Sequence, residues 1–76
     1  MKATYEKDSL LVETGNKMNL DELSEFTQFL TMIVNPTKIE IKQYIEEQNR
    51  SEVRLYITRE EANRLNDKLI FEYKTA

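Results

Sequence analysis

The sequence predicts an α+β domain of two layers, in which a small antiparallel sheet of about four strands carries two helices on one face. Apolar and polar residues alternate in two short runs between residues 38 and 58, which is typical of strands with one buried face. Two longer segments, at residues 20–34 and 59–73, repeat their apolar residues at helical spacing behind helix-capping sequences. With two short apolar runs near the start, these segments predict the order β-β-α-β-β-α within a single domain that spans residues 1–76.

The two alternating runs predict a β-hairpin. Most of its inward-facing side chains are aliphatic: Ile39, Ile41, Ile45, Val53, Leu55 and Ile57. A three-residue loop at residues 49–51 places Ile45 opposite Leu55 on the buried face and Tyr44 opposite Tyr56 on the other face. This register gives an apolar pair inside the domain and an aromatic pair on its solvent side.

One residue weakens the first strand of this hairpin, since Gln43 falls on its apolar face. A helix over residues 36–48 competes with the strand, because Asn35 is a good N-cap and proline suits the first helical position. The β-branched content of the segment and the clean partner strand favour the strand.

The chain before residue 14 predicts two more strands. Residues 3–6 and 9–13 are short runs with strand-forming side chains, and Lys7-Asp8 between them forms either a tight turn or a bulge in one longer strand. The run Leu10-Leu11-Val12 is apolar on both faces, which indicates a strand at the centre of the sheet or one that is covered.

The first helix follows Asn19, an N-cap residue with Glu22 three positions later, as in a capping box. Its apolar stripe consists of Leu23, Phe26, Leu30 and Ile33. We expect the helix to cover residues 20–34, where Asn35 caps its C-terminus and the following proline prevents continuation.

The second helix follows Thr58, and Glu61 completes another capping box. Its apolar stripe consists of Ala62, Leu65, Leu69 and Tyr73. We expect this helix to continue to Tyr73, while a last strand over residues 69–73 is the alternative.

Composition removes most kinds of catalytic site. The 76 residues include no cysteine and no histidine, so thiolate chemistry and the commonest general base and metal ligand are missing. One glycine and one proline leave no phosphate-binding loop. We therefore expect no enzyme activity, no cofactor and no metal site. No apolar stretch is long enough for a membrane span and the start does not resemble a signal peptide, so we expect a cytoplasmic protein.

The first helix supplies the first candidate binding surface. Its members are acidic or large and apolar: Asp21, Glu22, Glu25, Phe29 and Met32. No basic residue occurs between Lys17 and Lys38. An acidic surface with an aromatic ring and a methionine at its centre suits a partner protein with a basic surface. The alternative is that the two apolar side chains complete the edge of the core and the acids favour the helix dipole.

A second acidic group lies near the tip of the predicted hairpin, where Glu46, Glu47 and Glu52 surround Arg50. Carboxylates in this position can imitate backbone phosphates toward a nucleic-acid-binding protein, because they offer it the same charge. The alternative is that these charges only keep an exposed turn soluble.

The outer face of the hairpin carries aromatic and basic side chains: Lys42, Tyr44, Arg54 and Tyr56. This combination is typical of platforms that bind single-stranded nucleic acid. Glu40 and Glu46 share the face and repel phosphates, and the net charge of −3 is not that of a general nucleic-acid binder. Direct binding of nucleic acid is therefore the less favoured interpretation.

These observations favour a small, acidic, non-enzymatic protein-binding domain that inhibits or antagonises a partner with a basic or nucleic-acid-binding surface. Length, acidity and the lack of catalytic residues are compatible with the small inhibitors made by phages and mobile elements, including anti-defence proteins such as anti-CRISPR-like nuclease inhibitors. Two alternatives stay open. One is a nucleic-acid-binding regulator that uses the tyrosine face. The other is a homodimer or larger homo-oligomeric module, because the apolar first helix exceeds what one small sheet covers.

Overall fold

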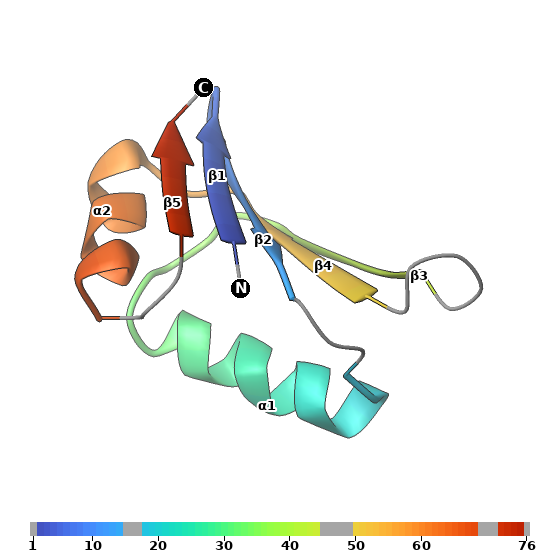
Figure 1. The fold of residues 1–76 in the computed structure, drawn as a ribbon. Helices are drawn as coiled ribbons and strands as arrows, with labels where there is room; N and C mark the ends of the chain where they lie inside the picture. Colours follow the sequence, from blue (N-terminus) through green and yellow to red (C-terminus); the bar gives the residue numbers. More distant parts are fainter. Residues whose placement is uncertain (1, 15–17, 45–49, 69–71, 76) are drawn as a thin grey trace.

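Figure 1 shows the computed structural model, which describes residues 2–14, 18–44, 50–68 and 72–75. Along the chain the elements are β1 (Lys2–Glu6), β2 (Ser9–Glu13), α1 (Leu20–Thr31), β3 (Ile39–Tyr44), β4 (Arg50–Leu55), α2 (Arg59–Lys68) and β5 (Glu72–Thr75). The predicted α+β class and the predicted order of the first six elements are confirmed, and a fifth strand follows them.

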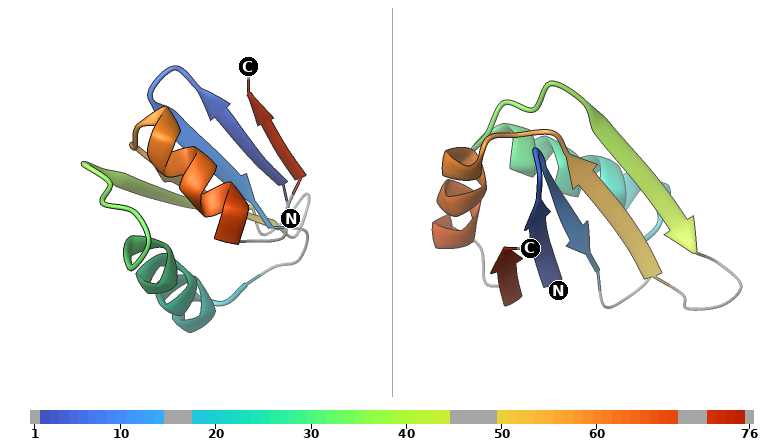
Figure 2. Two further views of the ribbon diagram at one scale, coloured as in Figure 1. Left: turned by 90° about the vertical axis from the view of Figure 1, so that its left-hand side faces the viewer. Right: turned by 90° about the horizontal axis from the view of Figure 1, so that it is seen from above.

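The sheet has the strand order β3-β4-β2-β1-β5. The pairs β3–β4, β4–β2 and β2–β1 are antiparallel, as predicted for a four-stranded sheet, and β5 adds to β1 in parallel. Side chains of both helices contribute to one core cluster with the strands, so both helices cover the same face of the sheet (Figure 2). Within the described residues, neither helix covers the other face, which we call the open face of the sheet.

The core lies between the sheet and the two helices. Its side chains come from alternate strand positions and from one side of each helix: Ala3, Tyr5, Leu10, Val12, Leu23, Leu30, Val34, Val53, Leu55, Ile57, Ala62 and Leu65. Phe26 and Ile33 pack against this cluster while partly buried, which confirms the predicted stripe of the first helix. The Tyr5 hydroxyl reaches across the core and donates to the Ile57 carbonyl at 3.0 Å.

The first two strands form a hairpin with Lys7 and Asp8 as its turn, which confirms the tight turn rather than a bulge. Lys7 has a positive φ of 62°, as the first central residue of a type I′ or II′ turn requires. Strand β2 lies between β1 and β4, so the prediction of a central strand from its continuous apolar run is confirmed.

The β3–β4 hairpin is confirmed over the competing helix for residues 39–44, but its predicted register is wrong. Leu55 pairs with Ile39, six positions before the predicted Ile45, and Tyr44 pairs with Arg50 instead of Tyr56. Residues 50 and 51, expected in a three-residue loop, belong to β4, and residues 45–49 lie outside the described chain. Because the shift is an even number, every side chain keeps its predicted face.

The register is fixed by polar groups that the alternation of apolar residues does not reveal. Thr14 accepts the Ser51 N–H with its hydroxyl, and its own N–H donates to the Ser51 carbonyl at 3.0 Å, so Ser51 is held beside β2 as part of a strand. Gln43, which weakened the strand prediction, pairs with Ser51 and donates to the Met18 carbonyl at 2.7 Å. The polar residues therefore meet at one end of the hairpin, next to the start of α1.

Helix α1 begins as predicted and ends earlier. Asn19 accepts the Glu22 N–H at 2.8 Å and Glu22 accepts the Asn19 N–H at 3.2 Å, which confirms the capping box. The helix ends at Thr31 with Met32 as its C-cap, instead of continuing to Val34 with Asn35 as the cap. The Asn35 N–H donates to the Glu61 carboxylate at 2.8 Å, so this residue is held by α2 and is not available to close α1.

Helix α2 also begins as predicted, since the Thr58 hydroxyl accepts the Glu61 N–H and Glu61 accepts the Thr58 N–H, each at 3.2 Å. It ends at Lys68, so the expected continuation to Tyr73 is wrong. The alternative of a final strand over residues 69–73 is confirmed at residues 72 and 73, while residues 69–71 lie outside the described chain. Strand β5 covers residues 72–75, with Ala3 opposite Tyr73. The outer edge of β1 offers unpaired backbone groups, and β5 uses them.

Candidate functional site

The outward side of α1 exposes apolar side chains that the fold does not use. Met32 lies about 180° around the helix from the buried Leu23, and 84% of its side chain is exposed. Phe29, on the same outward side, is 45% exposed. Exposure this high excludes a core role for Met32, so the core-edge interpretation fails for that residue.

The acids of this helix surround those two side chains. We define the α1 outer surface as the five residues predicted from the sequence, all of them exposed: Asp21, Glu22, Glu25, Phe29 and Met32. Asp21 and Glu22 lie in the first turn, where acids are favourable, and Glu22 also belongs to the capping box. Glu25 lies beyond that turn, and within the described ranges no ion pair involves any of the three acids. The fold therefore explains Asp21 and Glu22, but it does not explain Glu25, Phe29 and Met32.

The open face of the sheet carries charges that compensate one another. The Tyr56 hydroxyl donates to Glu40 Oε1 at 2.6 Å, and the Lys38 ammonium lies 5.6 Å from the centre of the same ring. This hydrogen bond raises the pKa of Tyr56 above its usual 10.0 and lowers the pKa of Glu40 below 4.5, because the phenol donates its proton to the carboxylate. Arg54 donates to the Ser9 hydroxyl at 2.8 Å.

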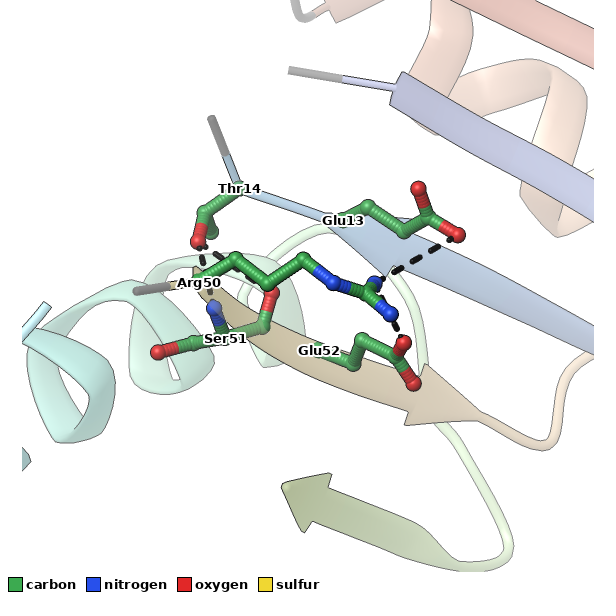
Figure 3. Close-up of polar contacts among 5 residues, drawn as sticks. All are labelled: Glu13, Thr14, Arg50, Ser51 and Glu52. Carbon is green, nitrogen blue, oxygen red and sulfur yellow. Dashed lines mark hydrogen bonds and ion pairs between the residues drawn. The ribbon is translucent and has the colours of Figure 1, made fainter. Parts of the chain in front are cut away.

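A second polar group on this sheet face lies at the start of β4, and Figure 3 shows its arrangement. The Arg50 guanidinium lies between two carboxylates, with Nη1 at 2.5 Å from Glu52 Oε1 and at 3.9 Å from Glu13 Oε1. Next to it, Thr14 and Ser51 are hydrogen-bonded to each other through both backbone and side-chain groups. Glu52 is a half-buried residue of β4 opposite Lys42, and it contacts Arg50 as predicted.

The remaining members of the two alternative sites are only partly placed. Glu46 and Glu47 lie outside the described residues, so the acidic hairpin tip is not assembled by the part of the chain that the structure describes. Lys42 is exposed on the open sheet face beside Arg54 and Glu40. Tyr44 belongs to β3, but its predicted partner Tyr56 lies beyond the other end of the hairpin. The structure thus brings together Lys42, Arg54 and Tyr56, with acids between them.

A hollow of about 420 Å³ lies at the end of the sheet where α2 begins. Tyr5, Tyr56, Arg59 and Glu61 contribute to its lining. Tyr5, Tyr56 and Glu61 already hydrogen-bond to other parts of the fold, and the Arg59 guanidinium lies 5.6 Å from the Tyr5 ring centre. These four side chains of the hollow are therefore engaged within the fold.

Sequence reasoning missed two features of these surfaces. Ile41 was expected to be buried and is 45% exposed, because β3 is the edge strand and its inner face is incompletely covered. Glu61 was predicted only as a helix cap, yet it also binds the Asn35 N–H, and these hydrogen bonds lower its pKa below 4.5. Neither a long-range contact of this kind nor the position of a strand at the edge of the sheet leaves a local signal.

Comparison with protein-family models, curated proteins and solved structures gives no significant match to this chain. Neither α1 nor α2 has the length and apolar content needed to cross a membrane, and this holds for every helix in the described ranges. Over the same ranges, no three carboxylates gather in a geometry that could hold a metal ion. The α1 outer surface is the group of side chains that most requires an explanation outside the fold.

Proposed function

We propose that the protein is a non-enzymatic binding domain whose α1 outer surface docks onto a basic surface of a partner protein. The side chains of Phe29 and Met32 enter an apolar depression of the partner, and Asp21, Glu22 and Glu25 face its lysines and arginines. A helix that presents an apolar pair surrounded by charge is a common way of binding a groove. The acids mainly increase the rate of encounter, and the apolar pair slows dissociation.

The exposure of Met32 carries this proposal. An 84% exposed methionine on the side of a helix opposite the core contributes little to folding, and methionine is enriched at protein interfaces. Phe29 and the three acids on the same surface give it a defined chemistry of negative charge around an apolar centre. The chain has a net charge of −3, and the α1 outer surface contains three acids and no base.

We infer that binding antagonises the partner. A basic surface with an apolar depression is typical of a site that holds nucleic acid, so an acidic domain that covers it excludes the nucleic acid by charge and by bulk. The length, the acidity and the absence of histidine and cysteine are compatible with a small nuclease inhibitor of the kind that phages and mobile elements make. The open sheet face gives less support to direct nucleic-acid binding, since Glu40, Glu13 and Glu52 lie among its bases.

The test is capture of partners from a lysate of the cell that makes the protein. We expect Phe29→Ala combined with Met32→Ser to lose the captured protein, while Leu20→Ser does not. Leu20 is the matched control because it is 72% exposed on the same helix and lies about 120° around it from Met32. Capture that survives the double change would contradict the proposal.

The charge component has its own control. Changing Asp21, Glu22 and Glu25 to the matching amides should slow association with the captured partner and reduce its salt dependence. The same change at Glu6, Glu60 and Asp67, which are also exposed, alters the net charge equally and should have a smaller effect. A band shift with single-stranded DNA and RNA measures the alternative. Nucleic-acid binding that is abolished by Tyr56→Ala, with no partner captured, would transfer the function to the open sheet face.

A further inference from the structure

The outer edge of β3 is a second surface that the fold leaves unpaired. Strand β3 is the last strand on its side of the sheet, and no strand in the described part of the chain pairs with its outer edge (Figure 2). Natural proteins usually protect such an edge with proline, a bulge, a covering segment or charged side chains such as lysine. Residues 39–43 contain no proline and pair with β4 without interruption, so neither proline nor a bulge protects this edge.

The hydrogen bonds of β4 show which backbone groups point to that edge. The Tyr56 N–H donates to the Lys38 carbonyl at 3.0 Å, so the backbone of Lys38 faces β4. This direction alternates along a strand, so Glu40 and Lys42 also face β4. On the other side of β4, the Ser51 carbonyl accepts the N–H of Thr14, the residue that follows β2. Ser51 therefore faces β2, which fits the same alternation. It follows that Ile39, Ile41 and Gln43 direct their N–H and C=O groups outward.

We propose that the protein self-associates through this edge, with β3 of one copy antiparallel to β3 of a second copy and Ile41 opposite Ile41. In this register the outward backbone groups of Ile39, Ile41 and Gln43 meet their counterparts and form about six hydrogen bonds. The Glu40 of each copy lies opposite the Lys42 of the other, which gives two such pairs on the open face of the sheet. Each Ile41, 45% exposed in one copy, covers the other.

The charges of β3 select this register over its neighbours. Sliding one copy along the other by two residues places Glu40 opposite Glu40 in one direction. In the other direction it places Lys42 opposite Lys42. Like charges directly opposite each other in a sheet are unfavourable, while opposite charges are favourable. The sequence Glu40-Ile41-Lys42 is therefore complementary to itself in antiparallel orientation, and a second copy of the chain is the occupant that fits.

The resulting dimer has one continuous sheet and buries few side chains, so we expect reversible association that depends on protein concentration. It uses β3 alone and none of the five residues of the α1 outer surface. The two proposals can therefore fail separately.

The first experiment measures amide hydrogen exchange of the unmodified protein at increasing concentration, together with its mass by sedimentation. We expect the mass to rise from the 9.1 kDa of one chain toward twice that value. The N–H groups of Ile39, Ile41 and Gln43 should gain protection as it rises, while those of Glu40 and Lys42 are protected throughout. A protein that stays monomeric at millimolar concentration would overturn the proposal. So would a dimer in which this alternating gain is absent, as in association through α1.

The second experiment reverses the charges. Glu40→Lys and Lys42→Glu should each weaken self-association at least about tenfold, because both place like charges opposite each other. An equimolar mixture of the two variants should recover the dimer, since each lysine of one then faces a glutamate of the other. Glu6→Lys and Lys2→Glu are the matched controls, with the same charges on exposed positions of β1. Weakening by either control change as well, or no recovery in the mixture of the two β3 variants, would contradict the register.

Discussion

The two helices cover the same sheet face and begin with the same type of cap, yet they differ on their outward sides. In α2 the exposed residues are all polar and include acids and bases, whereas α1 exposes Phe29 and Met32 among acids and has no base in its last turn. Charged residues of both signs on its outward side keep a helix soluble. The comparison shows that the inward side of each helix is explained by folding, and that only α1 has an outward side that is not.

The largest effect should come from the inward sides, where the two helices are alike. Leu30 of α1 and Leu65 of α2 are fully buried, and changing either to alanine should cost roughly 2–5 kcal/mol, from lost transfer free energy and a cavity. Urea unfolding monitored by circular dichroism measures both losses. A loss under about 1 kcal/mol for Leu30→Ala would mean that α1 is not seated on the sheet as described.

Removing the N-caps should reduce stability by a smaller amount, and the loss should differ between the two helices. Thr58→Ala should cost about 1 kcal/mol by removing the N-cap of α2, and amide exchange should then loosen first near residues 59–62. Asn19→Ala removes the cap of α1 with a similar direct cost. We expect the Thr58 change to be the more damaging, because Glu61 also holds the connection after α1 through Asn35. Equal losses would show that this link adds little to stability.

The link between the helices should also be sensitive to acid. Hydrogen bonds from the backbone N–H groups of Asn35 and Thr58 lower the pKa of Glu61 below its usual 4.5. A lowered pKa in the folded state gives stability that is present above about pH 4.5 and is lost as the pH falls through the folded value. Unfolding measured between pH 6 and 3 should show this loss, and Glu61→Gln should reduce its slope. An unchanged slope would assign the acid sensitivity to other carboxylates, with Glu40 the first to examine.

The smallest effect on stability should come from the outward side of α1. Met32→Ser should change the free energy of unfolding by no more than about 0.5 kcal/mol, because Met32 caps α1 with its backbone N–H and its exposed side chain lies outside the core. The same variant should nevertheless lose the partner. A large destabilisation would instead mean that Met32 is covered in the folded protein, which would remove the main difference between the two helices.

The sequence predicted those parts of the fold that depend on neighbouring residues. Both capping boxes, the turn at residues 7 and 8 and the stripe of α1 are local patterns, and each is confirmed. The register of β3 against β4 depends instead on Thr14 holding Ser51 from a distant strand. The apolar alternation has a period of two, so it cannot distinguish registers that differ by six residues. The end of α2 was predicted wrongly for a related reason, since Tyr73, which fits the helical stripe, pairs with Ala3 in β5 instead.

The candidate site followed the same rule. The acids and the two apolar residues of α1 were found because their spacing on one helix is a local property. The tyrosine face was not assembled as predicted, because pairing Tyr44 with Tyr56 required the wrong register. The exposure of Ile41 depends on which strand ends the sheet, and that information is spread over the whole chain.

The parallel pairing of β5 with β1 has a consequence for the order in which the protein folds. This pair joins residues 2–5 to residues 72–75, so the sheet is completed by contacts that span nearly the whole sequence. During synthesis from the N-terminus, β1 can form its hairpin with β2 early, but its other edge must wait until residue 75 has been made. Contacts of such long separation form slowly, because the loop between them must close first. An incomplete chain therefore exposes the edge of β1 in addition to that of β3, and any contact that occupies the edge of β1 at this stage competes with the protein's own last strand.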